Sequence, residues 1–244
     1  KYNWKYYSEP EQNLKNRNLF CPRGKMIGGC SAHNGMVYVR GNPNDYNRWA
    51  EQGLQSWSYK NVLPYFKKIE TWSGGENEFR GGNGLLPVNE SQNSNPLFKA
   101  FIKAAEEAGY SQNHDMNGKD QEGFGMYDVT IKNGERASVA KHYLYPIEKR
   151  RNLTISPDSF VEKIIFEGTQ AKGVEVKINN NKKILYTNKE IILSAGCINS
   201  PQLLMISGVG PAEDLKELGI RVVKDLPGVG KNLQDHLETY IQQE

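Results

Sequence analysis

The sequence lacks several features that would place it in a common class of protein. Its 244 residues contain no apolar run of the roughly 18 residues that a membrane-spanning helix needs. Cysteine is scarce and odd in number, and Cys21, Cys30 and Cys197 have neither zinc-site spacing nor a disulfide framework. The formal net charge is only +3, with the basic residues scattered. These absences argue against a membrane span, a metal site, a disulfide-stapled secreted fold and a nucleic-acid surface.

A further absence concerns nucleotide binding. The sequence has no Gly-x-Gly-x-x-Gly turn, the pattern that places a dinucleotide pyrophosphate at a helix N-terminus. The run 228–233 begins like one, but Leu233 stands where the third glycine belongs and Pro227 precedes it. The first residue is Lys1 rather than Met. We therefore expect this chain to be the middle part of a longer protein.

One segment that is present predicts a strand followed by a helix, near 190–208. An apolar run of strand length ends in the small pair Ala195-Gly196. Asn199 or Ser200 is predicted to cap a helix that begins at Pro201 and stops at a glycine. Small residues before a helix N-terminus let a planar or phosphorylated ligand approach the backbone, although ordinary α/β enzymes also contain such units.

A second segment, 22–41, is unusually poor in side-chain bulk. Gly24, Gly28 and Gly29 fall within six residues and are followed by Cys-Ser-Ala. A backbone of this kind can lie against a flat ring and offer N–H groups to it. Taken alone, such a run is a weak indication of function.

Together these two segments resemble the paired signatures of the glucose–methanol–choline (GMC) family of FAD-dependent oxidoreductases. A third stretch, Leu226–His236, is similar to a turn of the same family, as are Arg40–Tyr46, Gly53–Trp57 and Asn61–Phe66. The resemblance implies a mixed α/β fold: a fragment of a Rossmann-like FAD-binding domain with part of an antiparallel-sheet substrate domain.

The resemblance also divides the chain. Residues 1–88 are expected to form the FAD lid and an extended FAD-binding region, 89–150 part of the substrate-binding domain, and 151–244 a further part of the FAD-binding domain. The first Rossmann strand and the C-terminal catalytic region are expected to lie outside the chain. The family's general base, a late histidine, would follow Glu244, so we assign no catalytic residue here.

Local patterns predict the individual elements. Helices are expected from Pro43 to near Gly53, from Lys60 to Glu70 with Ser58 as its cap, and after an Asn95-Pro96 cap up to Gly109, with Trp49, Trp57, Tyr65 and Phe66 in the core. The glycine-rich stretch 73–88 is predicted to be a linker. A β-meander is expected from the short runs at 153–155, 161–166, 173–178, 183–186 and 190–193.

The resemblance assigns a set of cofactor-binding residues and no metal ligands. Most of the set lies along the flavin ring, whereas the backbone of Val161 would pair with the adenine. For Met26 and Val37, plain core packing is an equal alternative. The polar Asn34 favours a ligand role, because an unpaired buried amide costs about 1–3 kcal/mol. The full set is Met26, Gly28, Gly29, Ser31, His33, Asn34, Gly35, Met36, Val37, Val161, Ala195 and Gly196.

His33 departs from the usual family pattern. The run Gly28–Asn34 resembles the choline oxidases of the family, in which the corresponding histidine is bonded covalently to the flavin 8α-methyl group. Such a bond tethers the cofactor and raises its reduction potential. The alternative is a histidine that is hydrogen-bonded beneath the flavin without a covalent bond.

The implied function is the oxidation of a primary alcohol, choline or similar, by hydride transfer to flavin N5. Oxygen or a quinone would accept the electrons. Two alternatives are a hydroxynitrile lyase of the same family that contains FAD, and a catalytically incomplete fragment or binding module. We expect no nucleic-acid partner, and a location in the cytoplasm or at the periphery of the inner membrane.

Overall fold

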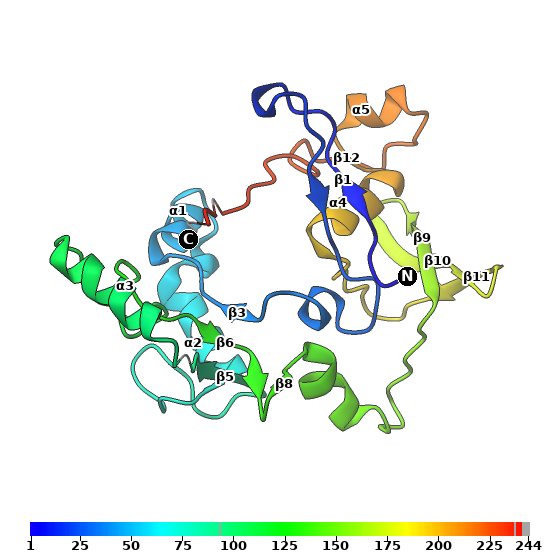
Figure 1. Ribbon diagram of the computed structural model, residues 1–244. Helices are drawn as coiled ribbons and strands as arrows, with labels where there is room; N and C mark the ends of the chain where they lie inside the picture. The colour runs from blue at the N-terminus through cyan, green and yellow to red at the C-terminus, as the bar shows by residue number, and fades with distance from the viewer. Residues whose placement is uncertain (93, 237, 241–244) are drawn as a thin grey trace. The chain divides into compact units, whose positions relative to one another are not determined.

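The computed structural model describes residues 1–92, 94–236 and 238–240 (Figure 1). The chain divides into two compact units, Lys1–Ile155 and Ser156–Glu244, which are described separately as unit 1 and unit 2. Both units combine helices with strands, so the predicted mixed α/β class is confirmed. None of the described helices is long and apolar enough to cross a lipid bilayer.

The three α-helices described in unit 1 lie where the sequence predicts them. α1 (Pro43–Glu51) and α3 (Pro96–Glu107) each begin with a proline, and the preceding asparagine accepts a hydrogen bond from the backbone N–H of the second helical residue. α2 (Tyr59–Ile69) follows Ser58, which occupies the cap position without a side-chain bond. The expected capping role of Ser58 is therefore wrong, although the helix is confirmed.

A four-stranded sheet connects distant parts of unit 1. Its order is β3 (Val37–Tyr38), β6 (Asp128–Val129), β5 (Leu86–Glu90) and β4 (Glu70–Trp72). β6 is antiparallel to both β3 and β5, whereas β4 and β5 are parallel. The predicted linker over 73–88 is thus wrong at its C-terminal end, which belongs to β5.

Two glycines of that stretch, Gly81 and Gly84, allow close packing of the backbone. A Cβ added to Gly81 would lie 1.9 Å from the carbonyl oxygen of Lys67, and one added to Gly84 would lie 2.2 Å from the carbonyl carbon of Ile69. Only glycine allows the backbone to come this near to the end of α2.

The two faces of the sheet differ in chemistry. Residues paired across neighbouring strands share a face, so Val37, Val129 and Asn89 lie on one side. Tyr38 and Asp128 lie on the other side. The second side is the more buried of the two and carries the charged cluster described below.

Shorter elements complete unit 1. β1 (Tyr6–Tyr7) pairs with β2 (Phe20–Cys21). β7 (Ile131–Lys132) and β8 (Glu135–Arg136) form a hairpin whose turn residues, Asn133 and Gly134, both have positive φ. The remaining turns of helix are Gln12–Leu14, Gly29–Ala32, Gln55–Trp57, Ala140–Leu144 and Tyr145–Ile147, of which Ala140–Leu144 is a π-helix.

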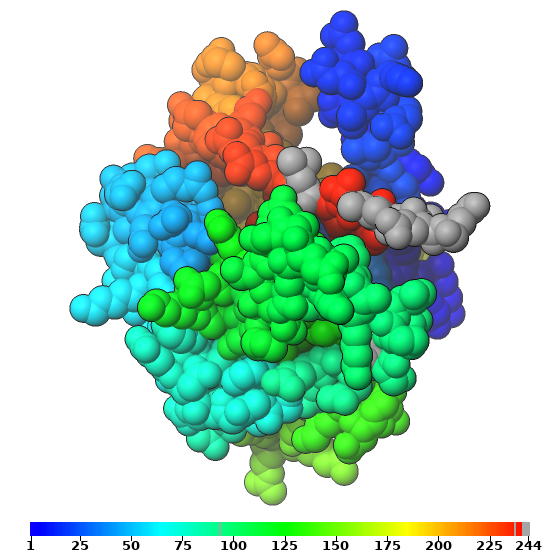
Figure 2. Space-filling model, turned by 60° about the vertical axis from the view of Figure 1, so that its left-hand side comes forward, coloured from blue at the N-terminus to red at the C-terminus, as the bar shows by residue number. Residues whose placement is uncertain are grey.

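Several apolar side chains of unit 1 lie at its surface, contrary to expectation. Trp49 and Trp57 contact each other edge to face but are 44% and 51% exposed, and Tyr65 is 68% exposed. The apolar stripe of α3 is also uncovered, with Leu97 72% exposed. Figure 2 shows the segment that contains α3, in green, at the surface of unit 1. Helical spacing predicts which residues share a side, but not whether another element covers it.

The described part of unit 2 contains an antiparallel meander and two α-helices. The meander has the order β11 (Asn181–Tyr186), β10 (Gln170–Ile178) and β9 (Ser159–Glu167), which confirms three of the five predicted strands. α4 (Gly196–Ile206) packs on β9. The remaining elements are β12 (Val209–Gly210), α5 (Ala212–Glu217) and β13 (Lys224–Asp225), with β12 parallel to β13.

Two predictions for unit 2 are wrong in detail. Residues 153–155, just before it, and 190–193 form no strand. No described strand pairs with 190–193, where Ile192 is 79% exposed, and an unpaired strand is not stable. α4 begins at Gly196 rather than at Pro201, which lies inside it. The predicted stop is confirmed, since Gly208 follows the helix with φ of +96°.

Candidate cofactor-binding site

The glycine segment, defined as residues 24–37, is packed tightly on one side. A Cβ added to Gly24 would lie 2.4 Å from the carbonyl oxygen of Gly29. Gly28 has φ of +92°, and an added Cβ would lie 3.2 Å from the Cβ of Ala140. A side chain at Gly24 would displace the backbone of Gly29, and one at Gly28 would be strained by the positive φ, so glycine is needed at both positions.

The opposite side of the glycine segment is open. A Cβ at Gly29 or Gly35 would meet no atom within 4 Å. Val37 is 51% exposed, and Ile27 is 39% exposed. A stretch of backbone with little side-chain bulk and neighbouring exposed apolar groups can accommodate a flat ring.

Met36 has an unusual backbone conformation that neighbouring residues hold in place. Its φ is +63°, in the left-handed region that a residue with a side chain rarely adopts. Its carbonyl oxygen accepts hydrogen bonds from the backbone N–H of Thr130 at 2.8 Å and from Thr130 Oγ1 at 3.2 Å. Its own N–H donates to Asn34 Oδ1 at 3.2 Å. Strain of this kind gathers at ligand sites.

The Ser31 side chain forms hydrogen bonds within the protein. Its Oγ donates to the carbonyl oxygen of Gly28 at 2.6 Å and accepts from the N–H of Val139 at 3.0 Å. The hydroxyl proton of Ser31 is therefore not available to donate to a ligand.

Asn34 is exposed, and its carbonyl groups are bound by an arginine that the sequence analysis did not single out. Arg136 Nη1 donates to Asn34 Oδ1 at 2.8 Å and to the Asn34 backbone oxygen at 2.7 Å. It also lies 3.4 Å from the backbone oxygen of Ser31. The premise of a buried amide is wrong, because Asn34 is exposed and its carboxamide oxygen has partners within the protein. Its ligand role stays a prediction.

His33 lies next to Asn34 with its side chain exposed. Its backbone N–H donates to the carbonyl oxygen of Cys30 at 3.1 Å. Among the described residues the imidazole has no hydrogen-bond partner. Its nitrogens are therefore available to an external group.

The other predicted residues belong to unit 2, apart from Met26, which is half-buried in the glycine segment. Val161 lies on β9 opposite Val176. Ala195 precedes α4, and its N–H donates to Ser200 Oγ at 3.0 Å. Gly196 has φ of +92° and nothing within 4 Å of an added Cβ. Gly196 is therefore a second open backbone position, at the start of α4.

A buried charged cluster in unit 1 has no counterpart in the predictions. Arg80 and Glu70 have no exposed side-chain surface, and Arg80 Nε lies 3.0 Å from Glu70 Oε1. Arg80 Nη1 contacts Asp115 at 2.6 Å and Asp128 at 2.8 Å, and Arg40 contacts Glu70 at 2.5 Å. The loss of water disfavours the charged guanidinium, but the hydrogen bonds and charges of Glu70 and Asp128 outweigh it and raise the pKa of Arg80.

The cluster ties the sheet to the loops around it. Asn117 donates through Nδ2 to the carbonyl oxygen of Tyr38 at 3.1 Å and accepts the N–H of Arg40 at 2.7 Å. Gly81 donates its N–H to Glu70 at 2.8 Å. Asn117 therefore fixes the backbone at the end of β3, directly after the glycine segment. An arginine within a glycine-rich stretch is the only sequence signal that could have indicated this cluster.

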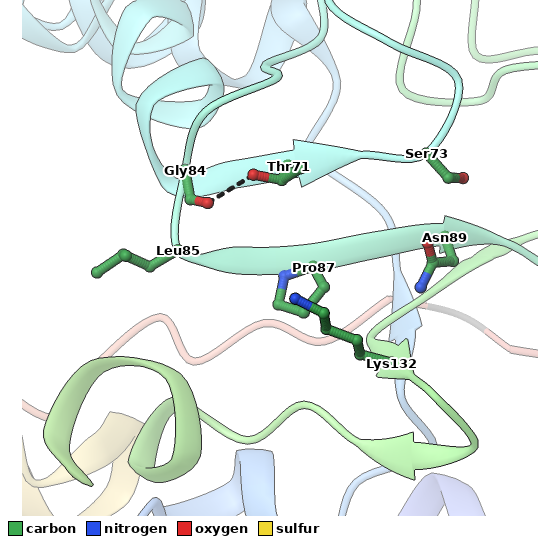
Figure 3. A pocket seen from close by; sticks show the side chains of 7 residues that line it. All are labelled: Thr71, Ser73, Gly84, Leu85, Pro87, Asn89 and Lys132. Atoms are coloured by element: carbon green, nitrogen blue, oxygen red, sulfur yellow. Dashed lines mark hydrogen bonds between the residues drawn. The ribbon is translucent and has the colours of Figure 1, made fainter. Parts of the chain in front are cut away.

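A small cavity of about 170 Å³ lies on the opposite face of the sheet, the face that carries Val37 (Figure 3). Its hydroxyl groups already have partners: Thr71 Oγ1 donates to Gly84 at 2.6 Å, and Ser73 Oγ accepts from the N–H of Glu90. Lys132 extends along it, so the cavity would repel a cation. Its lining residues are Thr71, Ser73, Gly84, Leu85, Pro87, Asn89 and Lys132. The described residues contain no group of three or more side chains that could hold a metal ion.

Comparisons with known proteins agree with this geometry. The family model for GMC oxidoreductases matches residues 11–238. Mitochondrial choline dehydrogenase of Mus musculus is 50% identical over 243 residues, which is 100% of this chain and 41% of the relative. Oxygen-dependent choline dehydrogenase of Brucella anthropi is likewise 50% identical, and the chain covers 44% of it. The chain thus spans less than half the length of these relatives.

Solved structures give the same result for the fold. Pyridoxine 4-oxidase from Mesorbium loti superimposes with a TM-score of 0.91 at 33% identity, covering 97% of this chain and 47% of that one. An FAD-dependent oxidoreductase from Chaetomium thermophilum gives a TM-score of 0.90 at 34% identity, covering 96% and 43%. Since the family model also extends over nearly the whole sequence, this chain belongs to the GMC oxidoreductase family.

Proposed function

We propose that this chain is part of an FAD-dependent enzyme that oxidises a primary alcohol, with choline as the first substrate to test. The observation that carries the proposal is the glycine segment, which is packed on one side and open at Gly29 and Gly35 on the other. A flat flavin ring requires such an uncovered backbone. The similarity to choline dehydrogenases supports the substrate class.

The residues of the glycine segment have two kinds of role in this proposal. Gly29, Gly35 and Val37 would lie against the ring, because their open side offers backbone and apolar surface. Ser31 and Thr130 hold the backbone that presents them, through the hydrogen bonds to Gly28 and Met36. When bound, FAD supplies the hydride acceptor, which amino-acid side chains cannot provide.

The start of α4 in unit 2 is proposed to bind the nucleotide part of FAD. Gly196 is open and begins α4, a helix whose N-terminal N–H groups favour a phosphate. The backbone of Val161 on β9 is the proposed contact for the adenine, as the family resemblance implies.

His33 is proposed to carry a covalent bond to the flavin 8α-methyl group. Its support is the choline-oxidase-like run Gly28–Asn34 and the exposed imidazole without a partner among the described residues. The test is acid precipitation of the full-length protein, by which we mean the longer protein expected to contain this chain. Flavin that stays with the polypeptide, and is released by His33→Ala, supports the bond. Flavin found in the acid supernatant of the unmutated protein excludes it.

Oxygen is the electron acceptor that we propose first, because one of the relatives is named an oxygen-dependent choline dehydrogenase. A quinone is the alternative. Consumption of oxygen in step with oxidation of choline would support the first, whereas turnover only after addition of a soluble quinone would support the second.

The decisive experiment is anaerobic addition of choline to the full-length protein. Loss of the visible flavin absorption on addition, and its return with air, would support alcohol oxidation. A flavin that stays oxidised while the protein cleaves a cyanohydrin would favour the lyase alternative, which none of the relatives described above supports. Protein that binds no flavin would show that the proposed function is wrong and leave the binding-module alternative.

A further inference from the structure

The hairpin β7–β8 brings one arginine to the glycine segment. Arg136, on β8, directs Nη1 at Asn34 Oδ1, at the Asn34 backbone oxygen and at the Ser31 backbone oxygen, at 2.8, 2.7 and 3.4 Å. The neighbouring Glu135 forms an ion pair with Lys141 and so does not compete for the guanidinium. A single positively charged donor therefore holds several carbonyl groups of one turn.

These contacts determine which way the Asn34 carboxamide points. An arginine and a backbone N–H can only donate hydrogen bonds, so the atom that Arg136 and Met36 both contact must be the oxygen. The amide NH₂ is consequently turned away from Arg136. Among the described residues it has no acceptor, and Asn34 is exposed.

We propose that Arg136 is a positioning residue that turns the Asn34 carboxamide so that its NH₂ group donates a hydrogen bond to the flavin. This inference rests on the proposed function, which supplies the ligand. The pyrimidine part of a flavin offers carbonyl oxygens and ring nitrogens that accept hydrogen bonds, and donors placed there adjust its electronic properties. An Asn34 turned the other way would present a second acceptor to these atoms.

Asn34→Asp in the full-length protein separates the orientation of the Asn34 amide toward the flavin from any contribution of Asn34 to the stability of the fold. The carboxylate keeps an oxygen for Arg136 and Met36 but replaces the NH₂ donor with a second oxygen. We expect the thermal unfolding temperature of the flavin-free protein to stay equal or rise, because Arg136 gains an ion pair. We expect the visible spectrum of the bound flavin to shift and flavin reduction by alcohol to slow up to about tenfold, the factor for one lost hydrogen bond.

Variants of the arginine provide the second arm. Arg136→Ala frees the carboxamide to turn, so its flavin spectrum should move in the direction seen for Asn34→Asp. Arg136→Lys keeps a cationic donor and should restore much of the unmutated spectrum. The matched control is Arg151→Ala, since Arg151 is an exposed arginine of unit 1 without a hydrogen bond or ion pair among the described residues. It should leave the spectrum unchanged.

The outcomes separate this inference from the proposed function. Unmutated protein that binds flavin and oxidises alcohol, with Asn34→Asp and Arg136→Ala spectra identical to its own, would overturn the inference alone. The inference alone also fails if the flavin-free Asn34→Asp protein unfolds well below the unmutated one, because Asn34 would then serve the fold. Unmutated protein without flavin would overturn both.

Discussion

At the scale of single residues, the glycines of the glycine segment serve opposite purposes. Gly24 is enclosed by protein, whereas Gly35 faces open space. We expect Gly24→Ala to destabilise the full-length protein by about 1–3 kcal/mol, because its methyl group would overlap the carbonyl of Gly29. Gly35→Leu should leave the unfolding free energy nearly unchanged but reduce flavin content. Denaturant titrations and the ratio of visible to ultraviolet absorbance measure the two effects.

Arg80 illustrates the cost of removing one member of a buried charged cluster. Its guanidinium balances Glu70, Asp115 and Asp128, and Arg80→Ala would leave the buried carboxylates without it. We expect a loss of about 3–5 kcal/mol in the free energy of unfolding, measured by urea denaturation. The control is Arg48→Ala, which removes an exposed ion pair with Asp45 and should cost at most about 1 kcal/mol. Equal losses of unfolding free energy in the two variants would show that Arg80 does not balance the buried carboxylates.

His142 introduces a pH dependence. Burial lowers the pKa of its imidazole, and the positive charges of Lys132 and Lys141 lower it further. Its Nε2 is buried without a partner among the described residues. The unfolded chain then takes up a proton near pH 6.5, before the folded protein does. Stability should therefore fall as pH falls through that value and level off below the folded pKa.

The comparison that isolates His142 is His142→Gln. Urea midpoints of both proteins are measured between about pH 7.5 and about pH 5.5. We expect the variant to lose less stability over this interval than the unmutated protein. Parallel curves would show that the other histidines account for the pH dependence.

At the scale of elements, one serine joins α4 to β9. Ser207 is 2% exposed; its Oγ accepts the N–H of Ile164 at 2.8 Å and donates to Leu203 at 2.6 Å. Ser207→Ala leaves the Ile164 N–H without a partner and should cost about 1–3 kcal/mol. Hydrogen exchange at Ile164 should accelerate in the variant, whereas Ser156→Ala, at an exposed serine, should leave it unaffected.

The elements that could be predicted are those whose signals are local. Asn-Pro before α1 and α3, and Gly208 after α4, determine helix ends through neighbouring atoms alone. β5 was not predicted, because its strand character depends on pairing with β4 and β6, which are distant in sequence. The run 190–193 shows the converse, since apolar residues form a strand only where a neighbouring strand is present.

The same distinction between local signals and contacts of distant segments applies to the candidate site. The open backbone at Gly29 and Gly35 was predictable, because glycine itself limits the bulk at those positions. The orientation of Asn34 was not, since it depends on Arg136, 102 residues later in the chain. The cluster around Arg80 likewise arises only when separate loops meet.

At the scale of the whole molecule, large apolar side chains stay uncovered in both units. Leu97, Tyr186 and Ile192 are 72%, 75% and 79% exposed. We expect the 244-residue chain produced alone to associate and to retain little FAD, because exposed apolar surface promotes aggregation and no Gly-x-Gly-x-x-Gly turn is present to bind the pyrophosphate. Gel filtration with absorbance detection tests this. A yellow monomer with one flavin per chain would contradict it.

The hydrogen bond from Val139 to Ser31 spans 108 positions of the chain, and this separation has a consequence for biosynthesis. At a translation rate of about 5–20 residues per second, roughly 5 to 20 seconds pass between the synthesis of Ser31 and that of Val139. Closing so long a loop is also entropically unfavourable and slow. The hydrogen bond that holds the Ser31 turn therefore forms late, only after Val139 has emerged from the ribosome.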